Sequence, residues 1–308
     1  MPPISGIWKL SRDVAILVST APRYEKLAQW TIERIKAFWP EHPEIHICGA
    51  EGIDGSLRLR DDSRDWMRVT ASACEDLLGA GFKKALLILD DHPPIARCNA
   101  GLLLCEMPRM LDEMDATSCL AVGPGPVLKR KGDYQKIGAH FFEKLPLSEP
   151  WKLALHPALW NIERLHNILR HLIDFLPDSQ HNPWAFERIG SSATEGGVSR
   201  EWLEACWRVD GWGAATVEAR QMHDFRDVCQ RVVLRSATIA MRPFGNAAEA
   251  FKSRVAFLWQ PRIGAYPCFW SGVMKKGGIN RDYLFYAEFK NRPDLAIGLT
   301  EIFREGEP

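Results

Sequence analysis

The chain has 308 residues, of which 46% are hydrophobic and 25% charged, so it is long enough to bury a substantial core. Its 39 Lys and Arg residues balance 39 Asp and Glu residues, which excludes the strongly basic field that non-specific nucleic-acid binding needs. The eight cysteines form no Cys-x-x-Cys pair, so we expect reduced thiols rather than a zinc site or a disulfide framework.

The first ninety residues alternate between short apolar runs and segments with helical spacing. The apolar runs 13–19, 44–49 and 85–89 are typical of buried parallel strands. The segments 24–39 and 66–78 are predicted helices, the first stopped by Pro40 and the second by Gly79. Strand and helix in alternation predict an α/β fold with parallel neighbours in the sheet.

The rest of the chain continues this alternation less regularly. We expect a helix over 96–114, strands at 119–123 and 152–159, and helices at 162–172 and 183–189, the last with Asn182 as a possible cap. Beyond 191 the pattern is weaker, with a helix predicted at 201–209 and either a strand or a helix at 228–241. The start of the chain has no signal-peptide core and no apolar run reaches about 20 residues, so a cytoplasmic protein without a transmembrane segment is expected.

Two acids and a histidine follow the third predicted strand in the stretch ALLILDDHPP. Asp90 and Asp91 lie at the carboxyl end of that strand, where open α/β sheets bind ligands, and Thr20 follows the first strand in the same way. Together with His92, the acids offer oxygen and nitrogen ligands to a divalent ion, which could in turn bind a diphosphate. The alternative is a helix cap with a surface acid beside it.

Two later motifs accompany this strand end. They are Leu-His-Pro-Ala-Leu-Trp-Asn at 155–161 and Pro-Trp-Ala-Phe-Glu at 183–187. With the Leu-Asp-Asp strand end, they make residues 13–192 resemble a family of bacterial GT-A-type glycosyltransferases associated with polysaccharide assembly. The segment YPCFWSGVMKK at 266–276 extends the resemblance. The order Asp-Asp-His departs from the Asp-x-Asp common in GT-A enzymes, which leaves metal identity and metal dependence open.

The resemblance implies a GT-A-like, Rossmann-type mixed sheet flanked by helices, with a C-terminal extension. Residues 1–195 would form the domain that binds nucleotide sugar and acceptor, and residues 196–308 an extension that packs on or closes the active site. The implied activity is transfer of a sugar, with inversion, from a nucleotide-diphosphate donor to a glycan or lipid-linked glycan. Such a protein would be cytoplasmic or peripheral at the inner membrane.

The resemblance also assigns roles to individual residues. Glu187 would be the general base, the alternative being an acid in the first turn of a helix, stabilised by the helix dipole. Further candidates follow from the positions of the residues. Those for donor binding are Thr20, Arg23, Asp90, Asp91, Lys275 and Lys276, with a solvated basic turn as the alternative for the two lysines. Those for acceptor binding are His156, Trp160 and Trp184, with a hydrogen-bonded structural histidine as the alternative for His156. Those for metal binding are Asp91 and His92, with Mn or Mg as the ion. For the tryptophans, packing in the core is the alternative.

Two other functions remain open at this point. A nucleotidyltransferase could use the same Asp pair, although the sequence contains no Gly-x-x-x-x-Gly-Lys phosphate loop. A catalytically inactive protein that binds sugars or nucleotides, or acts as a scaffold, could also keep this fold.

Overall fold

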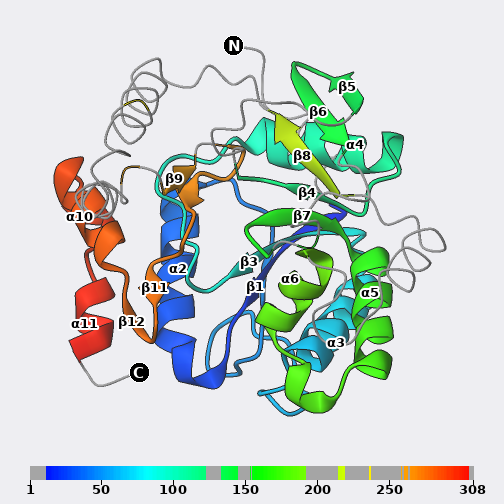
Figure 1. Cartoon of the computed structure of the whole chain (residues 1–308), viewed down its shortest axis with the longest axis horizontal. Helices are drawn as coiled ribbons and strands as arrows, with labels where there is room; N and C mark the ends of the chain where they lie inside the picture. Colours follow the sequence, from blue (N-terminus) through cyan, green and yellow to red (C-terminus); the bar gives the residue numbers. More distant parts are fainter. Residues whose placement is uncertain are drawn as a thin grey trace.

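The structure is a computed structural model that describes residues 12–122, 133–144, 153, 155–191, 214–218, 236, 258, 260–262 and 264–304. Figure 1 shows a central sheet with helices packed against it. The strands are β1 (Val14–Ser19), β2 (Ile45–Cys48), β3 (Lys84–Leu89), β4 (Ser118–Leu120), β5 (Asp133–Ile137), β6 (His140–Lys144), β7 (Ala158–Asn161), β8 (Ala214–Glu218), β9 (Pro261–Arg262), β10 (Cys268–Phe269), β11 (Met274–Lys275) and β12 (Gly278–Ile279).

The helices follow the strands in the alternation expected from the sequence. They are α2 (Glu25–Phe38), α3 (Trp66–Gly79), α4 (Met107–Glu113), α5 (Ile162–Phe175), α6 (Pro183–Ser191), α10 (Arg281–Phe289) and α11 (Leu299–Arg304). Shorter helical turns are η2 (Pro22–Tyr24), η3 (Leu102–Glu106, a π-helical turn), η4 (Asp178–Gln180) and η8 (Pro293–Leu295).

The main sheet of the described residues has eight strands in the order β2-β1-β3-β7-β4-β8-β6-β5. Strand β1 pairs in parallel with β2 and β3, β4 pairs in parallel with β8, and the other pairings are antiparallel. The protein therefore has the predicted α/β fold, with a mixed sheet flanked by helices.

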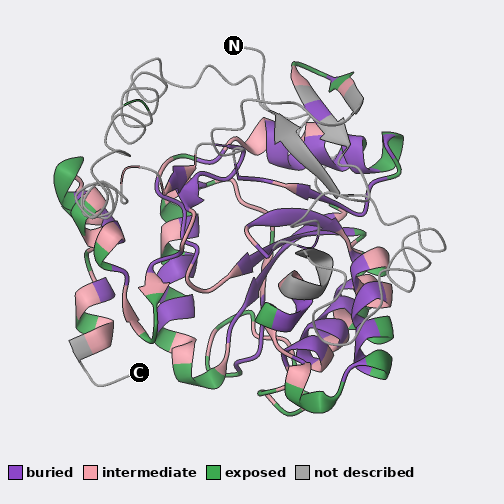
Figure 2. Ribbon diagram, viewed as in Figure 1, coloured by how far each residue is buried: buried purple, intermediate pink, exposed green. Residues whose placement is uncertain are grey.

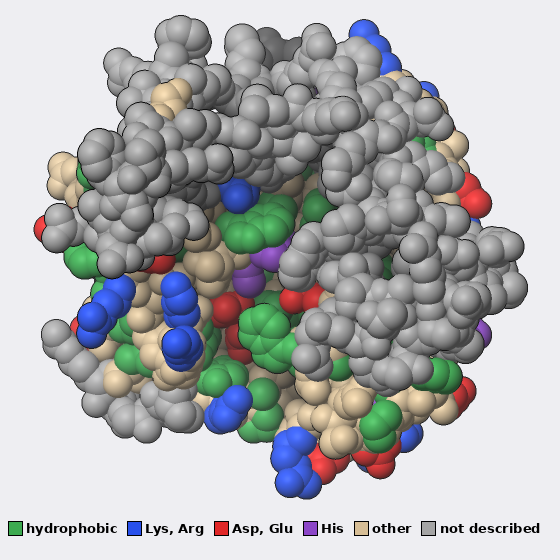
Figure 3. All heavy atoms as spheres, viewed as in Figure 1, with side chains coloured by type: hydrophobic (Ala, Val, Ile, Leu, Met, Phe, Trp, Pro, Cys, Tyr) green, Lys and Arg blue, Asp and Glu red, His purple; other side chains and the backbone are tan. Residues whose placement is uncertain are grey.

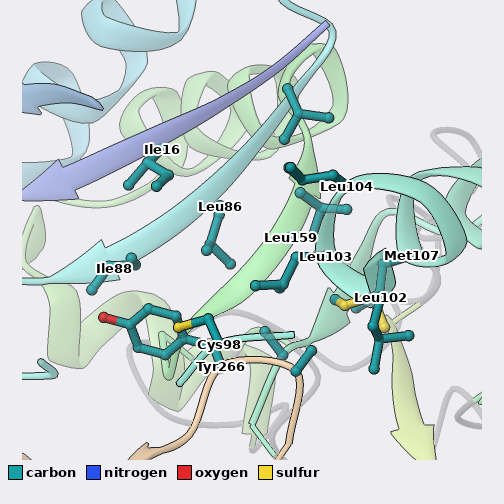
Figure 4. Close-up of a cluster of buried hydrophobic side chains, with 14 of the residues drawn as sticks. Ile16, Leu86, Ile88, Cys98, Leu102, Leu103, Leu104, Met107, Leu159 and Tyr266 are labelled. Atoms are coloured by element: carbon teal, nitrogen blue, oxygen red, sulfur yellow. The ribbon is translucent and has the colours of Figure 1, made fainter. Parts of the chain in front are cut away.

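Both faces of the sheet are covered, which explains why its central strands are continuous apolar runs. Along β3, Leu86 and Ile88 pack into the cluster formed with α2 and α4, whereas Ala85 and Leu87 pack into the cluster formed with α3, α5 and α6. Figure 4 shows part of the first cluster, and Figure 2 shows the central strands of the sheet buried between helices whose outer surfaces are exposed. This burial fixes the register of β3 and hence the position of Asp90 and Asp91 after it.

Two predicted elements differ from those observed. The strand expected at 152–159 is instead β7, which begins at Ala158 because the preceding backbone makes other bonds, including Leu155 N to the Glu187 side chain. The helix expected from residue 96 begins at residue 100, since Ile95 N donates to Pro267 O and Asn99 N donates to Ala265 O. The elements predicted at 201–209 and 228–241 lie outside the described residues, apart from residue 236.

The C-terminal part of the chain is joined to the sheet. Strand β8 lies between β4 and β6, so the predicted boundary after residue 195 does not separate the sheet from the C-terminal residues. Farther on, α10, η8 and α11 pack on the outer side of α2, where the Trp30 indole N–H donates to Ile297 O at 2.7 Å. The segment between β9 and α10 runs past the carboxyl ends of β1 and β3, where Val273 N donates to Asp91 O.

Candidate functional site

The carboxyl ends of β1 and β3 bring Thr20 and Asp90 into contact. These strands are parallel neighbours in register, with Ser19 opposite Leu89, so the residues after them emerge at the same edge of the sheet. The Thr20 hydroxyl donates to Asp90 Oδ2 at 2.5 Å, and the Thr31 hydroxyl of α2 donates to the Asp90 carbonyl oxygen, also at 2.5 Å. Burial and the neighbouring Asp91 carboxylate raise the pKa of Asp90 to about 7, against the effect of the Thr20 hydroxyl.

The Asp91 side chain bonds to His92 rather than to Asp90. Its Oδ1 atom accepts from His92 Nδ1 at 2.7 Å, and His92 Nε2 donates to the carbonyl oxygen of Trp270 at 3.3 Å. Both ring nitrogens therefore carry hydrogen. Burial alone would lower the pKa of His92, but Asp91, the Trp270 carbonyl and Glu187 outweigh it and raise the pKa above its ordinary value. His92 therefore bridges the Asp91 carboxylate and the Trp270 carbonyl group.

His156 lies beside His92 and is bound to the same carbonyl oxygen. Its Nε2 atom donates to Trp270 O at 3.0 Å, and its ring stacks on the Trp270 ring with centroids 3.5 Å apart. Burial, followed by the charge of His92, lowers the pKa of His156 to about 3, so this ring stays neutral. Within the described residues, its buried Nδ1 atom has no hydrogen-bond partner and presents a lone pair.

Glu187 is the fifth residue of α6, and its side chain reaches back to the chain before β7. Glu187 Oε1 accepts from Leu155 N at 2.7 Å. Burial raises the pKa of Glu187 from its ordinary value of 4.5, although the Leu155 N–H group opposes the shift. Helix α6 has no acid in its first turn, so Glu187 is not a surface acid stabilised there by the helix dipole. The predicted cap is present, since Asn182 Oδ1 accepts from Ala185 N at 2.9 Å.

Gly272 packs against Asp91 from the C-terminal segment. Its φ of +68° suits glycine, and a Cβ atom there would lie 2.3 Å from Asp91 Oδ2. Val273 N donates to Asp91 O at 2.7 Å, while the buried Asn280 amide donates to Ser271 Oγ at 2.8 Å and to Gly272 O at 2.9 Å. The segment 270–273 thus forms one wall of the site. No local sequence pattern indicates its contacts with the end of β3.

The remaining predicted residues have different surroundings. Arg23 is exposed, with its guanidinium carbon 4.6 Å from the Tyr24 ring centroid. Lys275 is 60% exposed and pairs with Asp282 at 3.8 Å, and Lys276 is exposed in the turn after it. Trp160 is completely buried, so it packs in the core and offers no surface to a sugar ring. Trp184, by contrast, is 74% exposed on α6, three residues before Glu187.

The predicted metal pair of Asp91 and His92 does not fit a bound ion. A metal binds histidine through a bare nitrogen lone pair, and both nitrogens of His92 donate hydrogen bonds. A different set that could bind a divalent ion lies on the α3 side of the molecule. The ligand atoms of Asp65, Asp178 and His181 lie within 4.8 Å of one another.

Existing interactions already occupy that second set. Asp65 caps α3 through Arg68 N and accepts from His181 Nδ1 at 2.8 Å, and His181 Nε2 donates to Leu176 O at 3.1 Å. Sequence reasoning missed this cluster because Asp65 lies 116 residues before His181, so no local spacing links it to Asp178 and His181.

Sequence reasoning also missed Arg262, whose guanidinium carbon lies 5.0 Å from the centroid of the Trp270 ring. Trp270 therefore connects Arg262 with the two histidines. Figure 3 shows a hollow in the middle of the viewed face, in which basic, hydrophobic, histidine and acidic side chains follow one another from top to bottom.

Comparison with known proteins gives no family for the chain. No family model matches it, and no curated protein matches it. Among solved structures, it is similar to the crystal structure of mannose-1-phosphate geranyltransferase from Thermus thermophilus, with 14% identity over 67% of this chain and 73% of that chain and a TM-score of 0.27. No helix among the described residues is long and apolar enough to cross a membrane.

Proposed function

We propose that this protein is a GT-A-type glycosyltransferase that moves a sugar from a nucleotide-diphosphate donor to a glycan acceptor, with inversion. The observation that carries the proposal is that Glu187, a partly buried acid held by Leu155 N, is close enough to Asp91 for their charges to interact, while Asp90 and Asp91 follow β3 at its carboxyl end. In open α/β sheets, ligands bind at this edge. A carboxylate of raised pKa is a stronger base than an ordinary glutamate, which suits it to accepting a proton.

Glycosyl transfer requires one bond to form as another breaks. The acceptor oxygen bonds to the anomeric carbon, the bond from that carbon to the diphosphate oxygen breaks, and the hydroxyl proton passes to the base. Glu187 would accept this proton through its carboxylate, while Leu155 N–H holds the side chain in place. In an inverting reaction, the base and the leaving group lie on opposite faces of the sugar.

The other acids would hold the donor. Asp90, with Thr20, and Asp91 can accept hydrogen bonds from sugar or ribose hydroxyls, since both lie at the strand ends. Trp184 would offer its exposed ring to the apolar face of an acceptor sugar, and the Nδ1 lone pair of His156 would accept from a substrate hydroxyl. A lipid-linked precursor of a polysaccharide would suit an enzyme working in the cytoplasm at the inner membrane.

A thermal-shift experiment tests the proposal at the level of binding. Wild-type protein is heated with UDP, GDP, dTDP or CMP, each with and without manganese. We expect one nucleotide to raise the melting temperature, because ligand that binds the folded state stabilises it. Asp91→Asn should lose most of this shift, whereas Asp174→Asn, which removes an exposed acid from α5, should keep it. A protein that responds to none of the nucleotides would be a scaffold, and the proposal would be wrong.

A further inference from the structure

A nucleotide diphosphate poses an electrostatic problem at this site. Two carboxyl groups, those of Asp90 and Asp91, lie where the donor would bind, and Glu187 on the acceptor side is close enough to Asp91 for their charges to interact. The diphosphate is itself anionic, and its negative charge grows as the bond to the sugar breaks. A cation must therefore offset that charge, supplied either by a metal ion or by a basic side chain.

The residues expected to hold a metal are committed to other contacts. His92 donates from Nδ1 to Asp91 and from Nε2 to Trp270 O. The second oxygen of Asp91 lies against Gly272, where a Cβ atom would approach it to 2.3 Å. An ion bound by Asp91 and His92 would have to break these contacts, which also hold the segment 270–273 in place.

A row of neighbouring side chains leads from Asp91 to a basic side chain, Arg262. Arg262 lies over Trp270 at 5.0 Å, Trp270 stacks on His156 at 3.5 Å, and the His156 ring meets the His92 ring edge-on at 5.4 Å. The row then ends at Asp91. Arg262 is anchored by its backbone, since it lies opposite Cys268 in the β9–β10 pair.

A position over an aromatic ring suits a guanidinium group to phosphate binding. A guanidinium that lies over an aromatic ring keeps its N–H groups directed outward in its own plane, where two of them can bind one phosphate side by side. Such an arrangement also limits the motion of a long side chain, which lowers the entropy lost on binding. Lys275 is a poorer candidate for this task, since it is 60% exposed and, within the described residues, lies over no aromatic ring.

We propose that Arg262, whose guanidinium group lies over the Trp270 ring, binds the diphosphate of the donor, so that this side chain rather than a metal ion at Asp91 and His92 offsets the charge of the diphosphate. This proposal rests on the proposed function for the identity of the donor. It adds the group that stabilises the leaving diphosphate and implies that donor binding does not require a divalent cation.

The test measures binding by calorimetry in the presence of EDTA. The probes are inorganic pyrophosphate and the nucleoside diphosphates UDP, GDP and dTDP, compared with the corresponding nucleosides. Wild-type protein should bind pyrophosphate and one nucleoside diphosphate without metal. Arg262→Gln should weaken both by about 10–100-fold, the range expected for losing hydrogen bonds to a charged group, and should leave nucleoside binding unchanged.

Two further variants serve as controls. Arg281→Gln removes an exposed positive charge from the start of α10 and should bind the probes as wild type does. Arg262→Lys keeps the charge but loses the planar fork, so it should fall between wild type and Arg262→Gln. It also provides the test if Arg262→Gln does not fold, as judged by circular dichroism.

The outcomes separate this inference from the proposed function. Binding that needs manganese, or that is equal in wild type, Arg262→Gln and Arg262→Lys, would overturn the role of Arg262 and leave the glycosyltransferase proposal standing. Wild-type protein that binds neither pyrophosphate nor any nucleotide, with or without manganese, would overturn both.

Discussion

At the residue scale, the proton chemistry of Glu187 predicts an unusual dependence on pH. Burial raises the pKa of this carboxyl from its ordinary value of 4.5, so a general base at this position becomes protonated at a higher pH than an ordinary glutamate. Turnover should therefore fall on the acid side at a pH clearly above 4.5. The measurement is the pH profile of turnover at saturating donor. An acid limb at or below the ordinary pKa would remove Glu187 as the titrating group.

The raised pKa of Glu187 also makes the free energy of unfolding depend on pH. A carboxyl whose pKa is higher in the folded state binds its proton more tightly when folded. Its contribution therefore favours folding below the ordinary pKa and is lost as the pH rises through the raised value. Replacing Glu187 with glutamine should remove this dependence, so wild type and Glu187→Gln should diverge in unfolding free energy as pH increases from 4.5.

A site residue could be predicted from the sequence when the residues next to it in the chain fix its position. Asp90 and Asp91 were identifiable because a buried strand places the residues after it at the sheet edge. The burial of Trp160 could not be predicted, because tryptophan occurs both in cores and on binding surfaces. In the structure this ring is completely buried. His92 was predicted to bind a metal, but its second partner is Trp270 O, which lies 178 residues away in sequence and leaves no local signal.

At the scale of elements, the segment 270–273 holds Asp91 by close packing at Gly272. Gly272→Ala would place a Cβ atom against Asp91 Oδ2 and force alanine to a φ of +68°. We expect a stability loss of about 1–2 kcal/mol from the backbone alone, and weaker nucleotide binding because Asp91 must move. The measurements are urea unfolding and nucleotide affinity.

A nearby glycine provides the matched control. Gly277 has a similar φ of +77°, but a Cβ atom there would have nothing within 4 Å. Gly277→Ala should carry the same backbone cost and bind nucleotide normally. Equal affinities in the two variants would show that the contact between Gly272 and Asp91 does not matter for binding.

The helices and strands that could be predicted are those whose bounds follow from the pattern of apolar residues within them. Strands β1, β2 and β3 and helices α2, α3 and α5 lie close to their predicted bounds because burial on both faces, or on one helical face, marks the sequence directly. The start of β7 and the late start of the helix after residue 95 depend on partners elsewhere. Ile95 N, for example, bonds to Pro267 O, and apolar periodicity carries no information about such a bond.

At the scale of the whole molecule, the mixed sheet joins distant parts of the chain around one site. The parallel pairing of the first three strands follows from their alternation with helices, and this part of the topology could be predicted. The insertion of β8 between β4 and β6 could not be predicted, because nothing in the sequence of residues 214–218 specifies which strands they pair with. The division at residue 195 placed β8 in an extension, although it belongs to the sheet.

The proposed function requires all these parts together, and the Glu187→Gln variant tests it most directly. Glutamine keeps the shape and can still accept from Leu155 N, but it cannot take up a proton. The control is Glu163→Gln, which alters an exposed acid in the first turn of α5. Donor affinity should be unchanged in both variants, since Glu187 is assigned to the acceptor side of the reaction.

The measurement is release of nucleoside diphosphate from a panel of nucleotide sugars, with and without glycan acceptors, by wild type, Glu187→Gln and Glu163→Gln. We predict that wild type and Glu163→Gln turn over one donor and that Glu187→Gln is slower by about 10²–10⁴-fold, the usual contribution of a general base. Equal turnover in a folded Glu187→Gln protein, or no turnover of any donor by wild type, would contradict the assignment of Glu187 as the base of a glycosyltransferase.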